Sequence, residues 1–149
     1  MPPLKEAGDM VDLSLTGINW LAVIVAGIVA WVVGAIWYAP PVFGKRWMEM
    51  MGMKMEPGKM PEGAGKALSG GVVLALVTAF FLALVLRFMG ATGWMDGVIG
   101  GLLVWLGFVA THGATSILFE RRPAAWYAIT QAELAVSFIL MGLILGVWR

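Results

Sequence analysis

The chain has no cysteine, a single histidine and few charged residues, which make up 13% of its 149 positions. Without cysteine it can form no disulfide, no CxxC redox site and no thiolate metal site. A lone histidine argues against zinc sites with several imidazoles and against Ser-His-Asp catalysis. The net charge of +1 provides no broad basic field for nucleic acid. We therefore predict that the protein is not an enzyme, binds no nucleic acid and carries neither a cofactor nor a metal ion.

Residues 1–17 lack the basic start of a cleavable signal peptide, because they are polar and acidic, with Glu6, Asp9 and Asp12. We expect this polar tail to precede a first apolar stretch that stays in the protein as a membrane anchor.

What the sequence has in abundance is hydrophobic residues, which make up 60% of it and give a mean hydropathy of +0.88. Soluble domains carry about a quarter charged residues, so this chain has too little polar surface to face water on all sides. Four of its apolar stretches are long enough for a helix that crosses the hydrocarbon of a bilayer, which takes about 20 residues. They cover residues 18–39, 68–89, 95–119 and 124–148. We predict a single all-α membrane domain, a bundle of four transmembrane helices in the lipid bilayer.

The only sizeable segment expected outside the hydrocarbon lies between the first two spans. Its residues 42–55 are amphipathic: at about 100° per residue, Phe43 and Trp47 fall on one helix face and Lys45 and Arg46 on the other. We predict a short helix lying flat on the bilayer surface. Residues 56–67, with two prolines and three glycines, should form a flexible linker to the second span.

The lysines and arginines are unequally divided between the two sides of this bundle. Residues 42–66 and the turn between the third and fourth spans hold seven of them, against three on the other side, namely Lys5, Arg87 and Arg149. The positive-inside rule then places both loops in the cytoplasm and both termini outside. We predict a multi-pass protein of the cell (inner) membrane with extracytoplasmic termini.

A run of methionines from Met48 to Met60 offers an alternative for the first loop, because closely spaced thioethers are soft ligands for Cu(I). The predicted cytoplasmic location argues against a copper-scavenging site. Methionines also suit the adaptable apolar face of an interfacial helix, which is the interpretation we prefer.

Small residues recur at four-residue spacing in every span. Lipid tails are as apolar as leucine, so close backbone approach and polar contacts must hold membrane helices together. The glycines that we expect at helix contacts are Gly97, Gly101, Gly142 and Gly146. Because four helices enclose little interior, some of these faces should pair between subunits, and we predict a homo-oligomer.

Two residues, His112 and Glu133, ionise deep inside the apolar stretches. They are equally far from the turn between the third and fourth spans, so an antiparallel hairpin places both about 16 Å from its tip, near the bilayer middle. Thr111, Thr115 and Gln131 add polar groups at this level. A charge at this depth costs about 2.5–3.5 kcal/mol. Either Glu133 is protonated, or it pairs with His112 as an imidazolium.

This intramembrane polar centre has two interpretations. It is the protonatable centre of a transporter or channel-like carrier, or it is a polar clasp that only holds the hairpin together. Intramembrane ionisable groups mark function in many membrane proteins, whereas small membrane proteins also use such pairs for assembly.

Two further segments share a pattern of aromatic, proline and charged residues. The first runs from Trp37-Tyr38-Ala39-Pro40-Pro41 through Phe43-Gly44-Lys45 to Trp47, and the second contains Glu120, Arg122 and Pro123. Together with residues 107–111 and 141–146, this pattern resembles the signature of a bacterial four-span membrane family of unknown function, domain of unknown function 1761. The resemblance covers nearly the whole chain outside the tail and the linker. It implies an integral membrane protein but no activity.

Both signature segments fall on the predicted cytoplasmic face, where Glu120 and Arg122 would be able to meet Lys45 or Arg46. We interpret them as an interfacial lock that fixes the helix ends. The alternative is a cytoplasmic mouth or a docking surface.

The leading functional prediction, which rests on the intramembrane polar centre, is a transporter or channel-like carrier of a small solute or ion. Its rival is a non-transporting structural or accessory subunit that docks a larger membrane complex.

Overall fold

The computed structural model describes residues 15–53 and 63–148, and the account below concerns these residues. Four helices in this part are long and apolar enough to cross a membrane, and no strand occurs in it. The structure therefore confirms the predicted all-α, four-helix membrane bundle with a short helix between its first two spans.

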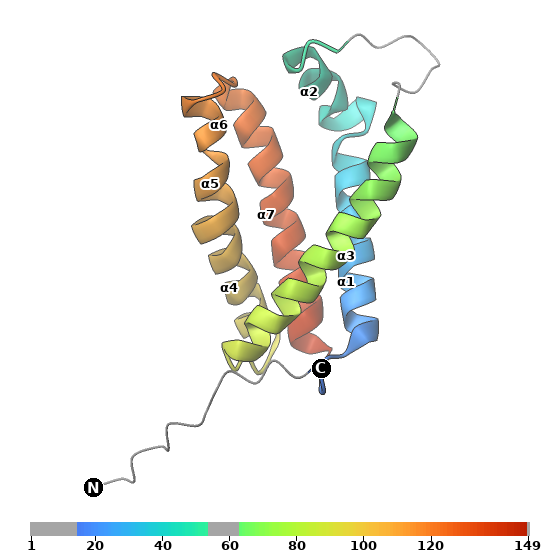
Figure 1. Ribbon diagram of the computed structural model, residues 1–149, viewed down its shortest axis with the longest axis vertical. Coiled ribbons are helices and arrows are strands. Elements are labelled where there is room, and N and C mark those ends of the chain that lie inside the picture. The colour runs from blue at the N-terminus through green and yellow to red at the C-terminus, as the bar shows by residue number, and fades with distance from the viewer. Residues whose placement is uncertain (1–14, 54–62, 149) are drawn as a thin grey trace, which may run out of the picture.

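The first span is α1, Trp20–Trp37, which begins where the side chain of Asn19 accepts a hydrogen bond from the Ala22 amide at 3.1 Å. A helix N-terminus has unsatisfied N–H groups, and an Asn at this position satisfies one of them. The span ends before the π-helical turn η1, Pro40–Gly44, which leads into the short helix α2, Lys45–Met50. Figure 1 shows α2 at one end of the bundle, bent away from the axis of α1.

The predicted helix over residues 42–55 was too long, because α2 ends at Met50. The amides of Met51, Gly52 and Met53 bond back to carbonyls of the last helical turn, and Gly52 has φ +69°. A glycine in this left-handed conformation closes a helix without the strain that a side chain would introduce. Residues 54 and 55, the last two of the predicted helix, lie outside the described part of the chain. Residues 1–14 of the tail and residues 56–62 of the linker lie outside it as well.

The second span is α3, Ala64–Phe88, which starts within the predicted linker. Ala64, Lys66 and Ala67 favour helix, so the helix extends back to Gly63, whose φ of +82° marks the turn before it. The third span runs from Trp94 to Leu118 and contains a π-helical stretch. Its parts are α4 (Trp94–Val104), η2 (Trp105–Ala110), α5 (Thr111–Gly113) and α6 (Thr115–Leu118). The fourth span is α7, Ala124–Val147.

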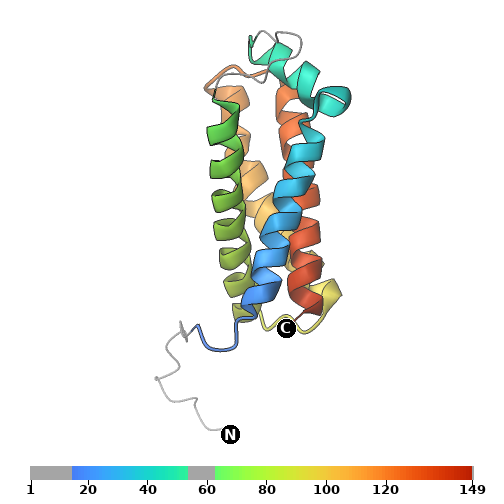
Figure 2. The same cartoon turned by 90° about the vertical axis from the view of Figure 1, so that its right-hand side faces the viewer.

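The four spans alternate in direction. The connection from α3 to α4 and the C-terminal end of α7 lie at one end of the bundle, and α2 and the turn from α6 to α7 lie at the other (Figures 1 and 2). The central helix is α7, which packs most extensively against α4 and then against α1, whereas α3 packs chiefly against α1. Accordingly 44% of the apolar window of α7 is buried, against 11% for α3.

The contact between α4 and α7 is a backbone contact. A Cβ atom added at Gly97 would collide with the carbonyl of Gly142, and one added at Gly142 would collide with the carbonyl of Gly97. Gly101 faces the Phe138 carbonyl and Gly146 faces the Gly93 carbonyl in the same way. The four glycines expected at helix contacts thus all lie in this one seam, where their missing side chains let the two helices touch.

Candidate functional site

A large open cavity of about 1140 Å³ lies between α1, α3 and α7, in the half of the bundle nearer α2. It forms because α3 packs chiefly against α1 and has few contacts with α7. Towards α2 the two helices α3 and α7 diverge (Figure 1). Residues of α2 and of the segment behind it, Trp47, Met48 and Met53, line the end of the cavity. Towards the other end of the bundle the interior is closed by packed side chains, among them Leu82, Leu86 and Leu145.

Glu133 lies on the wall of this cavity. It is the tenth residue of α7, about 14 Å along the helix from its start at 1.5 Å per residue. Its side chain is only 7% exposed, and its Oε1 accepts a hydrogen bond of 2.8 Å from the hydroxyl of Ser137, one turn further along. Opposite the carboxyl group is Gly34 of α1, where an added Cβ would lie 3.5 Å from Oε1. The carboxyl therefore faces α1 and the cavity.

His112 does not meet Glu133. Its side chain is exposed on the outer surface of α5, and no hydrogen bond or ion pair joins the two residues in the described part of the chain. The imidazolium–carboxylate pair and the polar clasp between these two residues are therefore wrong as predictions of contact. Equal depth in the hairpin does not put two side chains on facing sides of their helices.

The rest of the predicted polar centre also lies away from Glu133. Gln131 is buried and points at α5, since a Cβ at Gly113 would lie 2.5 Å from its Nε2. Tyr127, one turn earlier, donates a hydrogen bond of 2.9 Å to the Ala110 carbonyl on the same neighbour. Gln131 and Glu133 are two residues apart, about 200° around the helix, so they serve opposite faces of α7.

The two threonines of the predicted centre bond within their own helix. The hydroxyl of Thr111 donates to the Leu106 carbonyl at 2.6 Å, and that of Thr115 donates to the His112 carbonyl at 2.7 Å. Both residues are exposed beside His112. The structure thus divides the predicted centre into three parts: the buried carboxyl of Glu133 at the cavity, the buried amide of Gln131 between α7 and α5, and an exposed polar strip on α5 and α6.

Aromatic residues of the first signature segment pack against one another and hold α1, η1 and α2 in contact beside the cavity. The Trp37 ring packs on Phe43 with centroids 4.9 Å apart, and Tyr38 meets Trp47 edge to face at 5.5 Å. The indole N–H of Trp37 also donates to the Ile129 carbonyl of α7 at 3.2 Å. Pro40 opens the π-helical turn, because proline has no N–H and tolerates the first position of a helix.

Gly44 allows this turn to close. Its amide donates to the Ala39 carbonyl at 3.1 Å, and a Cβ at this position would collide with the carbonyl of Tyr38. The spacing of the segment therefore has a local reason: this tight turn brings Trp37 and Tyr38 into contact with the aromatic residues Phe43 and Trp47.

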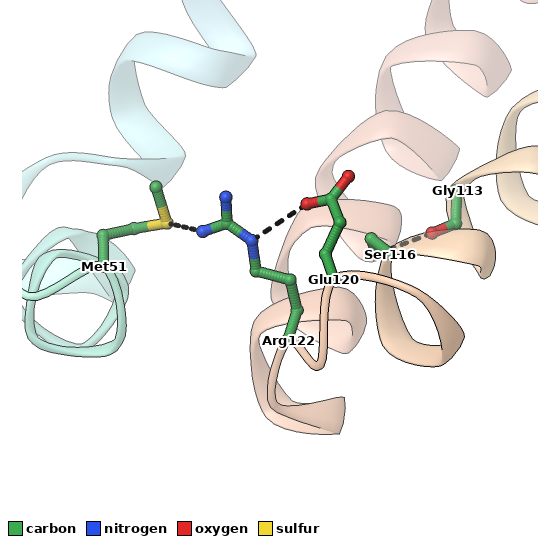
Figure 3. Close-up of polar contacts among 5 residues, drawn as sticks. All are labelled: Met51, Gly113, Ser116, Glu120 and Arg122. Atoms are coloured by element: carbon green, nitrogen blue, oxygen red, sulfur yellow. Dashed lines mark hydrogen bonds and ion pairs between the residues drawn. The ribbon is translucent and has the colours of Figure 1, made fainter.

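Through one arginine, the second signature segment reaches Met51 at the end of α2, beyond the first signature segment (Figure 3). The Nε of Arg122 pairs with Glu120 at 3.2 Å, and its Nη1 donates to the sulfur of Met51 at 2.7 Å. The same guanidinium lies 5.1 Å above the Trp126 ring. In the described part of the chain neither Lys45 nor Arg46 pairs with Glu120, so the predicted contact between charged loops is replaced by one with a thioether.

These contacts belong to a chain whose residues 21–146 match a protein family described as a protein of unknown function, DUF1761. The chain belongs to the DUF1761 family. No curated protein and no solved structure matches it. The matched range contains both signature segments, the glycine seam and Glu133, and the family description assigns no activity to any of them.

Two features of the DUF1761 site did not follow from the sequence reasoning. The partnership of Glu133 with Ser137 was missed although their spacing of four residues on a helix is a known signal. The role of Trp31 was also missed: its indole N–H donates to the Leu68 carbonyl at 3.0 Å and joins α1 to the start of α3 beside the cavity.

The methionines of the first loop have separate surroundings. Met51 accepts the hydrogen bond from Arg122, whereas Met48 and Met53 line the cavity. Met55 and Met60 lie outside the described residues. The Cu(I) site stays an alternative that these positions do not test.

Proposed function

We propose that the protein is a non-enzymatic carrier that moves a small solute or ion across the membrane, with Glu133 as its protonatable group. One observation carries this proposal: a buried carboxyl lies on the wall of an open cavity inside a bundle of membrane helices. A carboxyl at this depth is costly to keep, and a residue kept at such a cost favours a functional role.

The closed half of the bundle favours a carrier over an open channel. Beyond the cavity the core includes Leu82 and Leu86, which are 2% and 1% exposed. A second, smaller cavity of about 240 Å³ lies at the other end, beside Arg87. Access from one side, a packed middle and a second cavity are the arrangement expected of a carrier whose helices shift to open the site to the other side.

The absence of cysteine makes a direct test of water access practicable. Single cysteines are introduced at Ala75, on the cavity wall, at Leu74, which is 69% exposed on the outside of the same helix, and at Ala79, which is fully buried. We expect a water-soluble thiol reagent to modify the Ala75→Cys protein and to leave the other two unmodified. Modification of Leu74→Cys but not of Ala75→Cys would contradict an aqueous route to Glu133.

Transport itself is measured in vesicles that contain the purified protein and a trapped pH indicator. When candidate solutes are added outside the vesicles, we expect protons to cross the membrane in vesicles with the wild-type protein. We expect no proton movement in vesicles with Glu133→Gln. Ala75→Trp adds a large side chain to the cavity wall, leaves the carboxyl chemically unchanged and should abolish proton movement, whereas Leu74→Trp at the adjacent, outward position should retain it. Equal proton movement in wild type and Glu133→Gln would refute the role of this residue.

We further propose that the protein forms a homo-oligomer through the outer face of α5 and α6. His112, Thr111 and Thr115 are exposed on this face. In the middle of the bilayer the lipid tails offer an exposed imidazole no hydrogen-bond partner, and this is costly. A second copy can supply one, because a neutral imidazole both donates and accepts hydrogen bonds. A cysteine at His112 should form a disulfide-linked dimer under mild oxidation, whereas one at Val73, exposed on α3, should not.

The rival proposal is an accessory subunit that docks a larger membrane complex through this same face. It predicts that the protein extracted from its native membrane is part of a particle containing other chains, and that His112→Leu releases it. A particle that contains only this chain would favour the carrier.

For the orientation we propose an inner-membrane protein with α2 and the α6–α7 turn in the cytoplasm, as the excess of lysine and arginine on that side favours. In intact cells an impermeant thiol reagent should then modify a cysteine at Thr92, in the α3–α4 connection, but not one at Glu120. The reverse pattern would invert this topology.

A further inference from the structure

The wall of the large cavity is mostly apolar and carries few polar side chains. Among the described residues that line it, Glu133 is the one that carries a charge at neutral pH, since no lysine, arginine, histidine or aspartate is among them. The other titratable group among these described residues is the phenol of Tyr38, directly after α1, which is uncharged at neutral pH. The described part of the wall therefore carries a single negative charge when Glu133 is ionised.

Aromatic rings contribute to the same wall: Trp31 from α1, Tyr38 directly after α1, Trp47 from α2 and Phe138 from α7. The faces of aromatic rings carry partial negative charge and attract cations as well as apolar groups. Rings around one carboxylate are the surroundings in which an organic cation loses its water at least cost.

The size of the cavity excludes a bare metal ion as its natural occupant. Small-molecule pockets enclose about 300–1,000 Å³, and this open cavity of about 1140 Å³ is slightly larger than that range. An inorganic cation prefers several oxygen ligands, whereas this wall offers one carboxyl among hydroxyls that already donate elsewhere, as Ser137 does to Glu133 and Thr78 does to the Leu74 carbonyl.

We propose that this cavity binds a hydrophobic organic cation with one positive charge, which replaces the proton on Glu133. The inference rests on the proposed carrier function and specifies its substrate class. Binding breaks no covalent bond except O–H: the carboxyl releases its proton to water, and the cation takes its place beside the carboxylate. The ring faces hold the apolar groups of the cation.

The test compares two ions that have the same shape and opposite charge, tetraphenylphosphonium and tetraphenylborate. Their binding to purified protein in one detergent is measured by equilibrium dialysis against protein-free micelles. We expect the cation to bind to one site per chain and the anion to show no saturable binding. We also expect the cation to bind more tightly as pH rises, because it competes with the proton for Glu133. Saturable binding of both ions with equal affinity would overturn the inference in favour of a general apolar groove.

Variants test whether the carboxyl of Glu133 is responsible for cation binding and for its pH dependence. Glu133→Gln should weaken tetraphenylphosphonium binding by about tenfold or more, a loss of about 1.4 kcal/mol or more, and should remove its pH dependence. Glu133→Asp should keep both in part. Glu120→Gln, the same substitution at an exposed glutamate beside Arg122, should change neither. If Glu133→Gln does not fold, Ala75→Trp tests the cavity without altering the carboxyl and should also abolish binding. Wild-type affinity in a folded Glu133→Gln or Ala75→Trp protein overturns the proposal.

The failure of this inference differs from the failure of the carrier function. Proton movement with other solutes but no binding of tetraphenylphosphonium overturns the cation class and leaves the carrier function intact. Saturable, Glu133-dependent binding of the cation without proton movement in vesicles supports the site and overturns the carrier function.

Discussion

The carboxyl of Glu133 on α7 lies opposite the bare α-carbon of Gly34 on α1, where an added Cβ would be 3.5 Å from Oε1. This is an ordinary van der Waals distance, so the two helices leave room for a methyl group at Gly34. Gly34 also lines the cavity, which means that the same missing side chain exposes the carboxyl to the cavity.

Gly34→Ala should therefore be tolerated. Alanine costs less backbone entropy than glycine in a helix, by roughly 0.5–1 kcal/mol, and its methyl group meets no closer atom. We expect an equal or higher thermal unfolding midpoint for Gly34→Ala in one detergent. Gly34→Leu should lower the midpoint, because its larger side chain must displace the carboxyl. A strongly destabilised alanine variant would show that α1 and α7 are closer here than described.

Glu133→Gln should be as stable as the wild type or more stable. The amide oxygen of glutamine can still accept the hydrogen bond from Ser137, and the variant no longer carries an ionisable group at this depth. The unfolding midpoint is measured beside that of Glu120→Gln, which makes the same change on the surface. A clear loss of stability confined to Glu133→Gln would point to a structural role for the carboxyl and weaken the carrier proposal.

The glycine seam between α4 and α7 should not tolerate alanine. Gly97→Ala and Gly142→Ala each drive a methyl group into a carbonyl of the facing helix, and such overpacking costs about 1–3 kcal/mol. Gly107→Ala is the matched control, because no atom lies within 4 Å of the position its Cβ would take. Helix propensity alone would raise the midpoint of both variants, so midpoints that change equally at Gly97 and Gly107 would contradict the close backbone contact in the seam.

Arg121 has φ +56°, a left-handed conformation that disfavours every residue with a side chain except asparagine and aspartate. Arg121→Gly should be more stable than Arg121→Ala by about 1 kcal/mol, since glycine adopts this conformation without steric cost. Both variants remove the same charge, so the difference in their unfolding free energies reports the backbone alone. Equal stability of the two variants would contradict the conformation of this turn.

Trp37→Phe should lose the hydrogen bond to the Ile129 carbonyl and keep the ring contact with Phe43. The net cost of such a bond is about 0.5–1.5 kcal/mol. Trp94→Phe, at a residue that is 54% exposed, serves as the control and should change the unfolding free energy little. If both substitutions have the same effect, the indole N–H of Trp37 does not join α1 to α7.

The sequence was enough to predict the four spans, because the hydrocarbon of a bilayer demands about 20 apolar residues per helix and imposes this length on any chain that crosses it. It also led to Gly97, Gly101, Gly142 and Gly146, since backbone contact between membrane helices requires residues without side chains. These features depend on composition and on local spacing, which can be read along one chain.

The direction in which His112 and Glu133 point was decided only by the tertiary structure. Depth follows from counting residues, but direction follows from the angle around the helix, where an error of one residue is about 100°. The π-helical stretch η2 lies just before His112 and changes this angle relative to a regular α-helix, so the 3.6-residue period fails at that point. The cavity depends on α3 packing along α1 and diverging from α7, an arrangement that no local pattern specifies. Which residues surround Glu133 was therefore settled by how whole helices pack.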